Sequence, residues 1–327
     1  MRIALASIVA FALQGVSAFA QIYRVAEMNT EEIRALDRAK TVVLLPGGIL
    51  EQHGPYLPSF ADGYVSERVT ETVAEAIVAR PGWKALVFPM IPLGVGAANE
   101  IGGKYAFDGS YTVRSATLRA VFMDLADELG EGGFRKIFVV HFHLAPNQSR
   151  ALDEAADYFA DTYRGQMVHL VGLMPVIESY VGAAQIAGEA ERLENGFGVH
   201  ADLVETSINL FLRPDLVAPG YAKARSFTGR TISELIPAAK EANWPGYFGS
   251  PRHARADIGA AALRSLEGTI VGLVLKILDG FDYRQLPRYG DATRHDPGNI
   301  AIDRDAVADE RESASKQAGW LKKKGFQ

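Results

Sequence analysis

Short apolar runs alternate with amphipathic stretches along most of the chain. Continuous apolar runs predict strands buried on both faces, because a half-exposed strand would alternate apolar and polar residues. These runs lie at 41–46, 85–91, 136–141 and 167–173. Apolar residues at spacings of three or four predict helices, in addition to a short capped helix from Thr30. These helices are expected over 62–80, 118–129, 148–163, 201–212 and 254–278. Strands that alternate with helices predict an α/β fold with a mostly parallel sheet covered on both faces.

Residues 1–20 have the pattern of a secretory signal peptide. Arg2 precedes an apolar run over 3–13 that is too short to span a bilayer, and small residues lead to Ala18-Phe19-Ala20. Cleavage after Ala20 would leave a mature protein that is secreted or periplasmic. The alternatives are a buried N-terminal helix or an uncleaved anchor. The later apolar stretch 269–278 contains a lysine and is expected to be too short to cross a membrane, so no membrane contact is predicted after cleavage.

The remaining chain reads as one domain over 21–290 followed by a polar tail over 291–327. The tail contains the run Lys322-Lys323-Lys324 near its end. Such charge runs are typical of a solvated or frayed terminus, and no function is assigned to this segment.

The net charge and the absence of cysteine limit the possible partners and the possible metal ligands. The formal net charge is −5, which gives no electrostatic basis for nucleic-acid binding, so a small-molecule partner is expected. The chain has no cysteine, so any metal must be held by His, Asp and Glu. Neither a G-x-S-x-G nor an H-E-x-x-H motif is present, and 94-GVGAAN-99 lacks the third glycine of a dinucleotide-binding loop.

Candidate ligands follow two of the predicted strands. Glu51, His53 and Asp62 come after the first strand, and His141 and His143 end the third. In a parallel sheet these positions share the carboxyl edge, where ligands bind. Side chains two residues apart in an extended chain point the same way. The structural alternative is that Asp62 only caps a helix and that the histidines only pack.

Carboxylate and imidazole ligands without thiolate suit Zn²⁺, Mn²⁺ or a similar divalent ion. A carboxylate shared between two ions would hold a metal pair about 3.5–4 Å apart, an arrangement common in hydrolases. A bridging hydroxide could then attack a carbonyl without a side-chain nucleophile. The sequence therefore favours metal-assisted hydrolysis.

One long segment resembles a known family signature. The stretch 45-LPGGILEQHGPYLPSFAD-62 is similar to the L-P-x-G-[ST]-x-E-Q-H-G-P-H-L-P pattern of the creatininase family of metal-dependent amidohydrolases, including the Asp nine residues after the His. Four further segments resemble family motifs in the same order. They are 107-FDGSYT-112, 133-GFRKIFVVHFH-143, 200-HADLVETS-207 and 246-GYFGSP-251.

The resemblance implies a three-layer α/β/α subunit around a short, mostly parallel sheet, in a homo-oligomer that is often a hexamer. It also implies two divalent ions per subunit, which are Zn²⁺ or Mn²⁺ or both, with Fe²⁺ as a further option. With these ions the enzyme would open a non-peptide C–N bond of a cyclic or linear amide. By position, Glu51, Asp62 and His143 would hold one ion, and His53 and Asp62 the other. His200 would donate a proton to the leaving nitrogen, unless it only packs at a helix start.

The chain departs from the family at the pocket. The family's acid two residues after the metal-binding His is Ala145 here, so the second ion lacks a ligand. Glu205 is the best replacement, with a role at both the metal and the catalytic site, and His141 and Asp202 are weaker candidates. Because these changes surround the pocket, the family's substrate is not carried over. A periplasmic ligand-binding or metal-binding protein without turnover is the alternative hypothesis.

Overall fold

The computed structural model describes residues 21–326, so the predicted signal peptide lies outside the described residues. Five strands form one parallel sheet in the order β1-β3-β2-β4-β5. They are β1 (Ile22–Arg24), β2 (Thr41–Gly47), β3 (Lys84–Val87), β4 (Lys136–His141) and β5 (Gln166–His169). The edge strand β1 was not predicted, and β3 and β5 each begin one residue before the predicted runs 85–91 and 167–173 and end four residues earlier than those runs.

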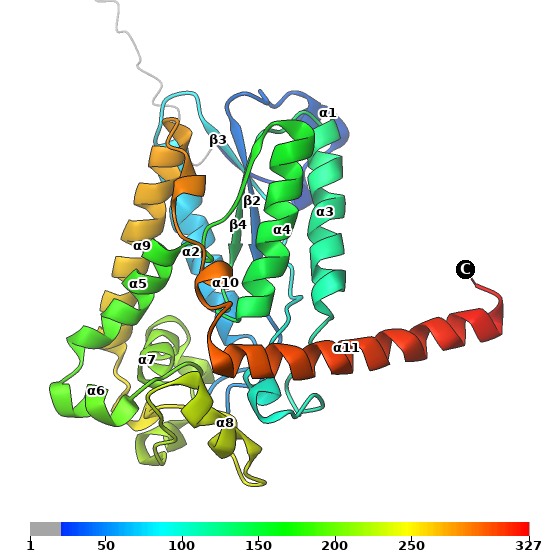
Figure 1. Cartoon of the computed structure of the whole chain (residues 1–327). Coiled ribbons are helices and arrows are strands. Elements are labelled where there is room, and N and C mark those ends of the chain that lie inside the picture. Colours follow the sequence, from blue (N-terminus) through cyan, green and yellow to red (C-terminus); the bar gives the residue numbers. More distant parts are fainter. Residues whose placement is uncertain (1–20, 327) are drawn as a thin grey trace, which may run out of the picture.

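Helices cover both faces of the sheet and make three layers (Figure 1). One face carries α2 (Ala61–Val78), α5 (Met174–Gly182), α7 (Leu203–Leu212) and α9 (Ala256–Leu278). The other carries α3 (Ser115–Glu131) and α4 (Pro146–Tyr163). The remaining α-helices are α1 (Thr30–Arg34), α6 (Glu189–Asn195), α8 (Ile232–Lys240), α10 (Tyr289–Ala292) and α11 (Pro297–Lys324). Short 3₁₀ helices span Val25–Glu27, Ala98–Gly102 (η3), Ala183–Ile186, Pro214–Leu216, Pro219–Lys223, Pro251–His253 and Tyr283–Gln285. The predicted α/β sandwich is confirmed.

The continuous apolar character of β2 follows from burial on both faces. Successive side chains of a strand point to opposite faces. Val42 and Leu44 therefore pack with α2 and α9, whereas Val43 and Leu45 pack with α3 and α4. This central strand holds the loop that follows it at the carboxyl edge of the sheet.

Helix α9 is long and apolar enough to cross a membrane by length and composition, which the shorter stretch 269–278 did not suggest. Half of the most apolar stretch of α9 is buried inside the protein, and the helix packs on α2, α5 and α7. Its place in the core accounts for its composition.

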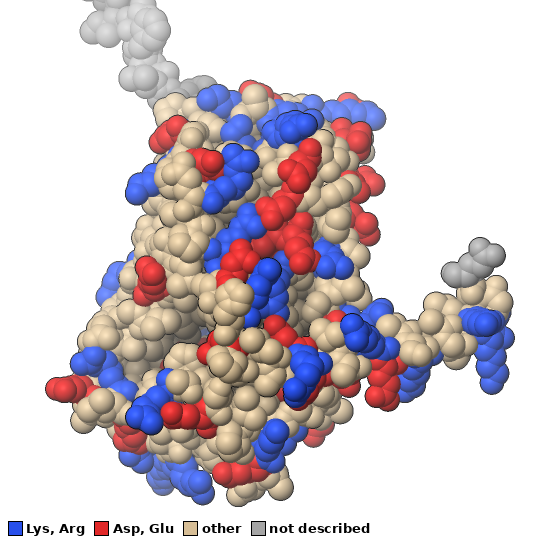
Figure 2. Space-filling view, in the orientation of Figure 1, with Lys and Arg blue, Asp and Glu red and all other residues tan. Residues whose placement is uncertain are grey.

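The C-terminal segment differs from the predicted frayed tail. Asp296 caps α11 by accepting a hydrogen bond from the Asn299 amide at 2.9 Å, and Gly325 ends the helix in a left-handed conformation. The first half of α11 crosses the end of the molecule beside α8, and the second half projects away from it (Figure 1). Lysines gather at the far end of this projection (Figure 2). Both helix ends carry good capping residues, which explains the regular structure.

Gly259 sets the approach of α9 to α7, and its substitution gives a test of this packing. A methyl group at Gly259 would lie 1.9 Å from the Ser207 carbonyl oxygen. We expect Gly259→Ala to lower the free energy of unfolding by about 1–3 kcal/mol, measured by urea denaturation. At Gly268, in the same helix, a methyl group meets nothing within 4 Å. Gly268→Ala should raise that free energy by up to about 1 kcal/mol. Equal effects of the two variants would contradict the close approach.

Candidate metal centre

The structure gathers predicted site residues from four separate parts of the chain at the carboxyl edge of the sheet. The loop after β2, the first turn of α2, the end of β4 and the start of α7 each contribute, and all the side chains are buried. The residues are Glu51, His53, Asp62, His143, His200 and Glu205. Three carboxylates and three imidazoles therefore share one buried space.

Glu51, Asp62 and His143 form the first group. The Nδ1 atom of His143 lies 3.1 Å from Oε2 of Glu51 and 3.3 Å from Oδ2 of Asp62. Those two carboxylate oxygens are buried and accept no hydrogen bond within the part of the chain that the structure describes. Buried carboxylate oxygens left in this state are costly unless a cation satisfies them.

His53, Asp62 and Glu205 form the second group. The Nε2 atom of His53 lies 3.3 Å from Oε1 of Glu205 and 4.0 Å from Oδ1 of Asp62. The other oxygen of Glu205 accepts a hydrogen bond from the Ala201 amide. Asp62 thus offers one oxygen to each group.

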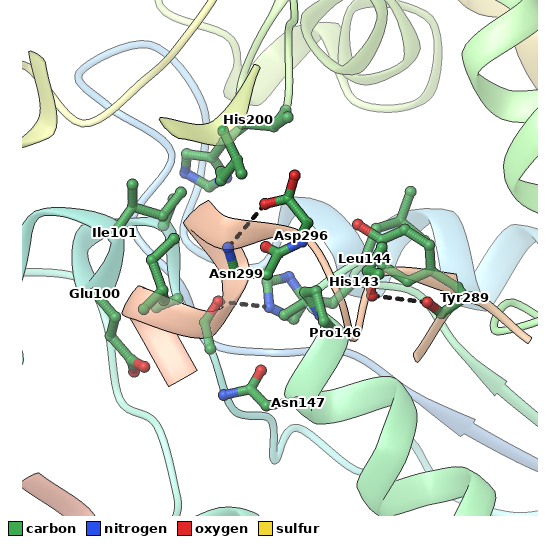
Figure 3. A pocket seen from close by; sticks show the side chains of 18 of the residues that line it. Glu100, Ile101, His143, Leu144, Pro146, Asn147, His200, Tyr289, Asp296 and Asn299 are labelled. Carbon is green, nitrogen blue, oxygen red and sulfur yellow. Dashed lines mark hydrogen bonds between the residues drawn. The ribbon is translucent and has the colours of Figure 1, made fainter. Parts of the chain in front are cut away.

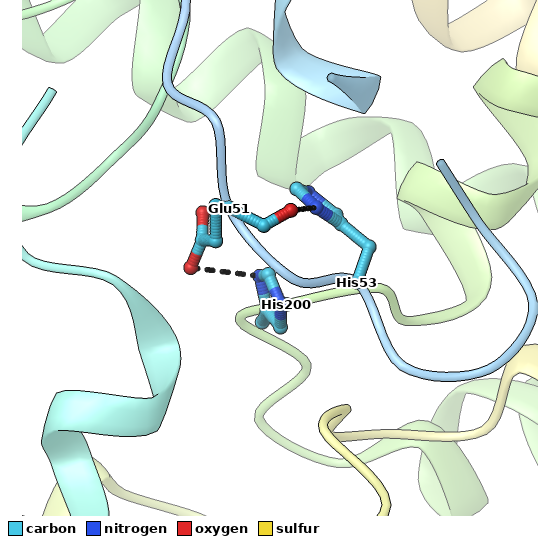
Figure 4. Close-up of side chains that lie close together, drawn as sticks. All are labelled: Glu51, His53 and His200. Carbon is cyan, nitrogen blue, oxygen red and sulfur yellow. Dashed lines mark hydrogen bonds and ion pairs between the residues drawn. The ribbon is translucent and has the colours of Figure 1, made fainter. Parts of the chain in front are cut away.

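His200 reaches the same space from the loop before α7 (Figure 4). Its Nδ1 atom lies 3.5 Å from Oε1 of Glu51, and its ring centre lies 4.3 Å from that of His53. Its Nε2 atom lies 2.6 Å from the carbonyl oxygen of Gln52. Glu51, His53 and His200 consequently form a third group of possible ligands.

Hydrogen bonds to the backbone orient the imidazoles. His143 Nε2 lies 3.1 Å from the Val95 carbonyl oxygen, and His53 Nδ1 lies 2.9 Å from the Glu51 carbonyl oxygen. A carbonyl can only accept, so these nitrogens carry the proton, as does His200 Nε2. The opposite nitrogen of each ring then faces carboxylate oxygens, and this contact needs either a second proton or a metal ion. Metal-binding histidines are held in this way.

The pKa values show how strongly the cluster favours positive charge. Burial opposes protonation of His53, but the charges of Glu205, Asp62 and Glu51 outweigh it and raise the pKa of His53 to about 10. Burial also disfavours the charged form of Glu205, yet His53 lowers the pKa of this carboxyl to about 2. Burial raises the pKa of Asp62 to about 6. Burial also opposes protonation of His143, but the nearby carboxylates of Glu51 and Asp62 raise its pKa, so in the absence of metal protonated His53 and His143 supply the cationic charge.

The two weaker candidate ligands lie outside the cluster. Both ring nitrogens of His141 are engaged, Nε2 with the Leu93 carbonyl at 2.8 Å and Nδ1 with the Gln148 amide nitrogen at 3.0 Å. Asp202 caps α7 by accepting hydrogen bonds from the Val204 and Glu205 amides. Neither residue joins a group of possible ligands.

Backbone strain is concentrated at the site. His143 has φ 147° and Ala201 has φ 49°, values that favour glycine, and Arg164 is the only other non-glycine residue with positive φ among residues 21–326. Such strain persists where surrounding contacts enforce it, and it is common at functional sites.

A cavity of about 500 Å³ opens onto the cluster (Figure 3). Its walls include residues that the sequence analysis did not select, among them Glu100, Asn147 and Tyr180, and Asp296 and Asn299 from the C-terminal segment. Glu100 lies in a Gly-rich stretch that lacks the residue spacing expected of metal ligands. The other polar residues lie in helical segments in which no sequence motif indicates a binding role. Only the polar character of the segment after Asp291 could have drawn attention to it.

Comparisons with known proteins agree on one family. The family model described as Creatininase, creatinine amidohydrolase, matches residues 26–274. The creatinine amidohydrolase of Pseudomonas putida is 29% identical over 199 residues, which is 59% of this chain and 73% of that protein. The mycofactocin precursor peptide peptidase of Mycobacterium ulcerans is 23% identical over 266 residues, 78% of this chain and 93% of that protein.

Solved creatininases share the fold. A crystal structure of creatinine amidohydrolase aligns with a TM-score of 0.60 at 25% identity, over 79% of this chain and 98% of that chain. A creatininase variant described as Zn–Zn type aligns with a TM-score of 0.57 at 25% identity, over 78% and 98%. A manganese form gives 0.58 at 24% identity, with the same coverage. Together with the carboxylate and histidine cluster, the Zn–Zn form, at 25% identity, supports divalent metal binding.

The charge of His53 gives the metal-free protein a pH signature. Its pKa is about 10 in the fold against 6.5 for an ordinary histidine. The stabilisation is therefore complete below about pH 6.5 and is lost as pH rises toward 10. We expect the free energy of unfolding of chelator-treated protein, measured with urea, to fall across this window. His53→Gln should flatten the fall, whereas His295→Gln, at an exposed position, should not. Stability that is constant or rises with pH would contradict a charged His53.

Proposed function

Because the chain belongs to the creatininase family, we propose that it is an exported hydrolase that uses two metal ions to open a C–N bond of a cyclic or linear amide. The observation that carries this proposal is the position of Asp62. Its two carboxylate oxygens face two different groups of ligands, Glu51 with His143 and His53 with Glu205. A helix cap alone would not place Asp62 between two buried imidazoles.

The donor set fits two divalent ions. Glu51, Asp62 and His143 would hold one, and His53, Asp62 and Glu205 the other. In this arrangement Glu205 replaces the family acid that is absent at Ala145. Two such ions, Zn²⁺ or Mn²⁺, would polarise the amide carbonyl and lower the pKa of a water molecule.

The residues of the chain itself position and protonate the substrate. His200 is the proposed proton donor to the leaving nitrogen, because its Nδ1 atom faces the carboxylate of Glu51 while Nε2 is fixed on the Gln52 carbonyl. Burial lowers the pKa of His200, so a proton that it accepts is readily passed on. Phe142 and Tyr180, which also line the cavity, would exclude water from the scissile bond.

We propose a non-peptide amide as the substrate, and short peptides are the alternative. Support comes from the relatives, which include a creatinine amidohydrolase as well as peptide peptidases. The cavity of about 500 Å³ admits substrates of either size. The substrate must therefore be found with a panel that contains both kinds of amide.

Hydrolysis of that panel tests the function. Purified protein should cleave at least one member of a set of lactams, small linear amides and dipeptides. A chelator should abolish the activity, and Zn²⁺ or Mn²⁺ should restore it. Ala145 is the observation that favours the alternative, a binding protein without turnover. Metal-loaded protein that binds amides but hydrolyses none would support that alternative and contradict the proposal.

Metal stoichiometry tests the assignment of ligands. We expect Asp62→Ala to lose both ions, because its carboxylate serves both groups. Glu205→Gln should keep about one ion per subunit and lose most activity, because an amide keeps the shape but loses the charge. Asp202→Asn, which preserves the helix cap, is the control and should keep two ions. Element analysis of purified protein decides, and full occupancy in Asp62→Ala would show that Asp62 is only a cap.

Export is proposed from the N-terminal pattern of residues 1–20. The mature protein should begin at Gln21, which mass spectrometry of a periplasmic fraction can establish. A form that retains Met1 and is confined to the cytosol would contradict it. The homo-oligomer implied by the family resemblance stays a prediction.

A further inference from the structure

Residues 318–326 form a C-terminal tip that extends beyond the body of the protein (Figure 1). Two contacts just before the tip fix the direction of α11. The Glu310 carboxylate accepts hydrogen bonds from the amide and the hydroxyl of Ser115, both at 2.7 Å, and Arg114 donates one to Gln317 at 3.1 Å. Every residue of the tip is exposed. The body therefore sets where the tip points, while the side chains of the tip face solvent.

The tip gathers three large apolar side chains in one place. Trp320, Leu321 and Phe326 are 55%, 39% and 59% exposed. The left-handed Gly325 turns the chain back, so that the Phe326 amide donates to the Leu321 carbonyl at 3.0 Å and the rings of Phe326 and Trp320 stack with their centres 6.1 Å apart. Apolar contacts of this kind are common at helix ends. A helix end without tertiary contacts is marginal in water, and an apolar surface left exposed there indicates a partner.

A second apolar surface lies on α5, on α6 and on the short helix η4 (Ala183–Ile186) between them. Its exposed apolar residues are Val181, Ile186 and Leu193. The three elements form one surface, because η4 packs on both helices and Arg192 of α6 donates a hydrogen bond to Gln185 of η4. In Figure 1, α5 and α6 lie on the opposite side of the molecule from the tip. The tip of one chain therefore cannot reach this apolar patch of the same chain.

The charges around the tip and the patch are complementary. The tip carries Lys322–Lys324, and Figure 2 shows these basic side chains at its far end. Glu178 and Glu189 are exposed at i−3 from Val181 and i−4 from Leu193, on the same faces of α5 and α6, and form no ion pair within residues 21–326. The whole chain has a net charge of −5. A second copy would thus attract the basic tip, whereas an anionic membrane would attract the tip but repel the rest of the chain.

We propose that the tip of one subunit docks on the patch of a second copy of this chain, with the apolar side chains in contact and the lysines beside Glu178 and Glu189. The two surfaces differ and lie on opposite sides of the molecule, so the contact is head-to-tail, and its repetition closes a ring when the rotation allows. Each subunit of a ring would make the contact twice, once through its tip and once through its patch. The tip lies outside residues 26–274, where the chain matches its family, and the inference does not depend on the proposed hydrolysis.

The absence of cysteine makes this contact testable by cross-linking. A variant with both Lys323→Cys and Glu189→Cys carries one thiol in the tip and one beside the patch. A short bismaleimide should link it into a ladder of subunits on a denaturing gel, because the two thiols of one chain lie on opposite sides of the molecule. In the control, Lys323→Cys is combined with Glu128→Cys, at an exposed position of α3 outside the patch. The control and each single variant should give at most linked pairs.

Sedimentation velocity over a range of protein concentrations measures the strength of association. Leu321→Asp in the tip and Leu193→Asp in the patch should each weaken association about tenfold or more, because each places a carboxylate in an apolar contact. Ile300→Asp is the matched control and should leave association unchanged. Ile300 is 52% exposed on the same helix, close to its start and outside both surfaces.

Three results would overturn the inference. The first is no ladder from the paired variant, or association that is equal in the unmodified protein and in the two aspartate variants of the tip and the patch. The second is a monomeric protein that binds vesicles of phosphatidylcholine and phosphatidylglycerol and loses this binding in Leu321→Asp, since the tip would then dock on a membrane. The third is an effect of Ile300→Asp as large as that of Leu321→Asp, which would place the contact along α11 in general. None of these results bears on the metal centre.

Discussion

Three buried carboxylates share one space with three buried imidazoles, and these carboxylates need positive charge close to them. The arrangement of the protein depends on meeting this need. Isolated buried charges are too costly to persist, so the cluster exists only as a set of matched partners. The backbone carbonyls that orient His53, His143 and His200 leave one nitrogen of each ring facing carboxylate oxygens. Second protons on His53 and His143 can supply positive charge at these positions, and so can divalent ions, which the proposed hydrolysis requires.

Much of the surrounding structure serves to hold this cluster. The Ser110 hydroxyl accepts the Gln52 amide hydrogen at 3.1 Å and donates to Asn99 at 2.7 Å, so the segment 107–112 braces the loop that carries Glu51 and His53. The Ala98 amide donates to Glu51 at 2.6 Å. The motif over 107–112 contributes no metal ligand, and its contact with the loop that carries the ligands explains its place beside the site. The positive φ of His143 occurs where its ring is held between the Val95 carbonyl and the carboxylates of Glu51 and Asp62.

The central part of the fold and the proximity of several site residues could be predicted from the sequence. Strands buried on both faces read as continuous apolar runs, and parallel strands bring their carboxyl ends together, so Glu51, Asp62 and His143 had to lie near one another. Glu205 lies far along the chain, and only a family motif connected it to the cluster. The edge strand β1 has three residues, too few for a pattern, and its pairing with β3 decides its conformation. The regular helix within the predicted polar tail was missed because α11 has only Gly298 and Ala306 buried, so its sequence carries little amphipathic signal.

The ligand cluster and the C-terminal wall of the cavity come from different parts of the chain. The ligand cluster lies wholly within residues 26–274, where the chain matches its family, and its geometry depends on the sheet and on α2 and α7. The wall formed by α10 and α11 lies outside that match and is attached mainly by hydrogen bonds and ion pairs, among them Arg288 with Asp157 and Arg150 with Asp303. Polar attachment of this kind can be altered without disturbing the apolar core. A change in this wall would therefore leave the residues of the ligand cluster in place.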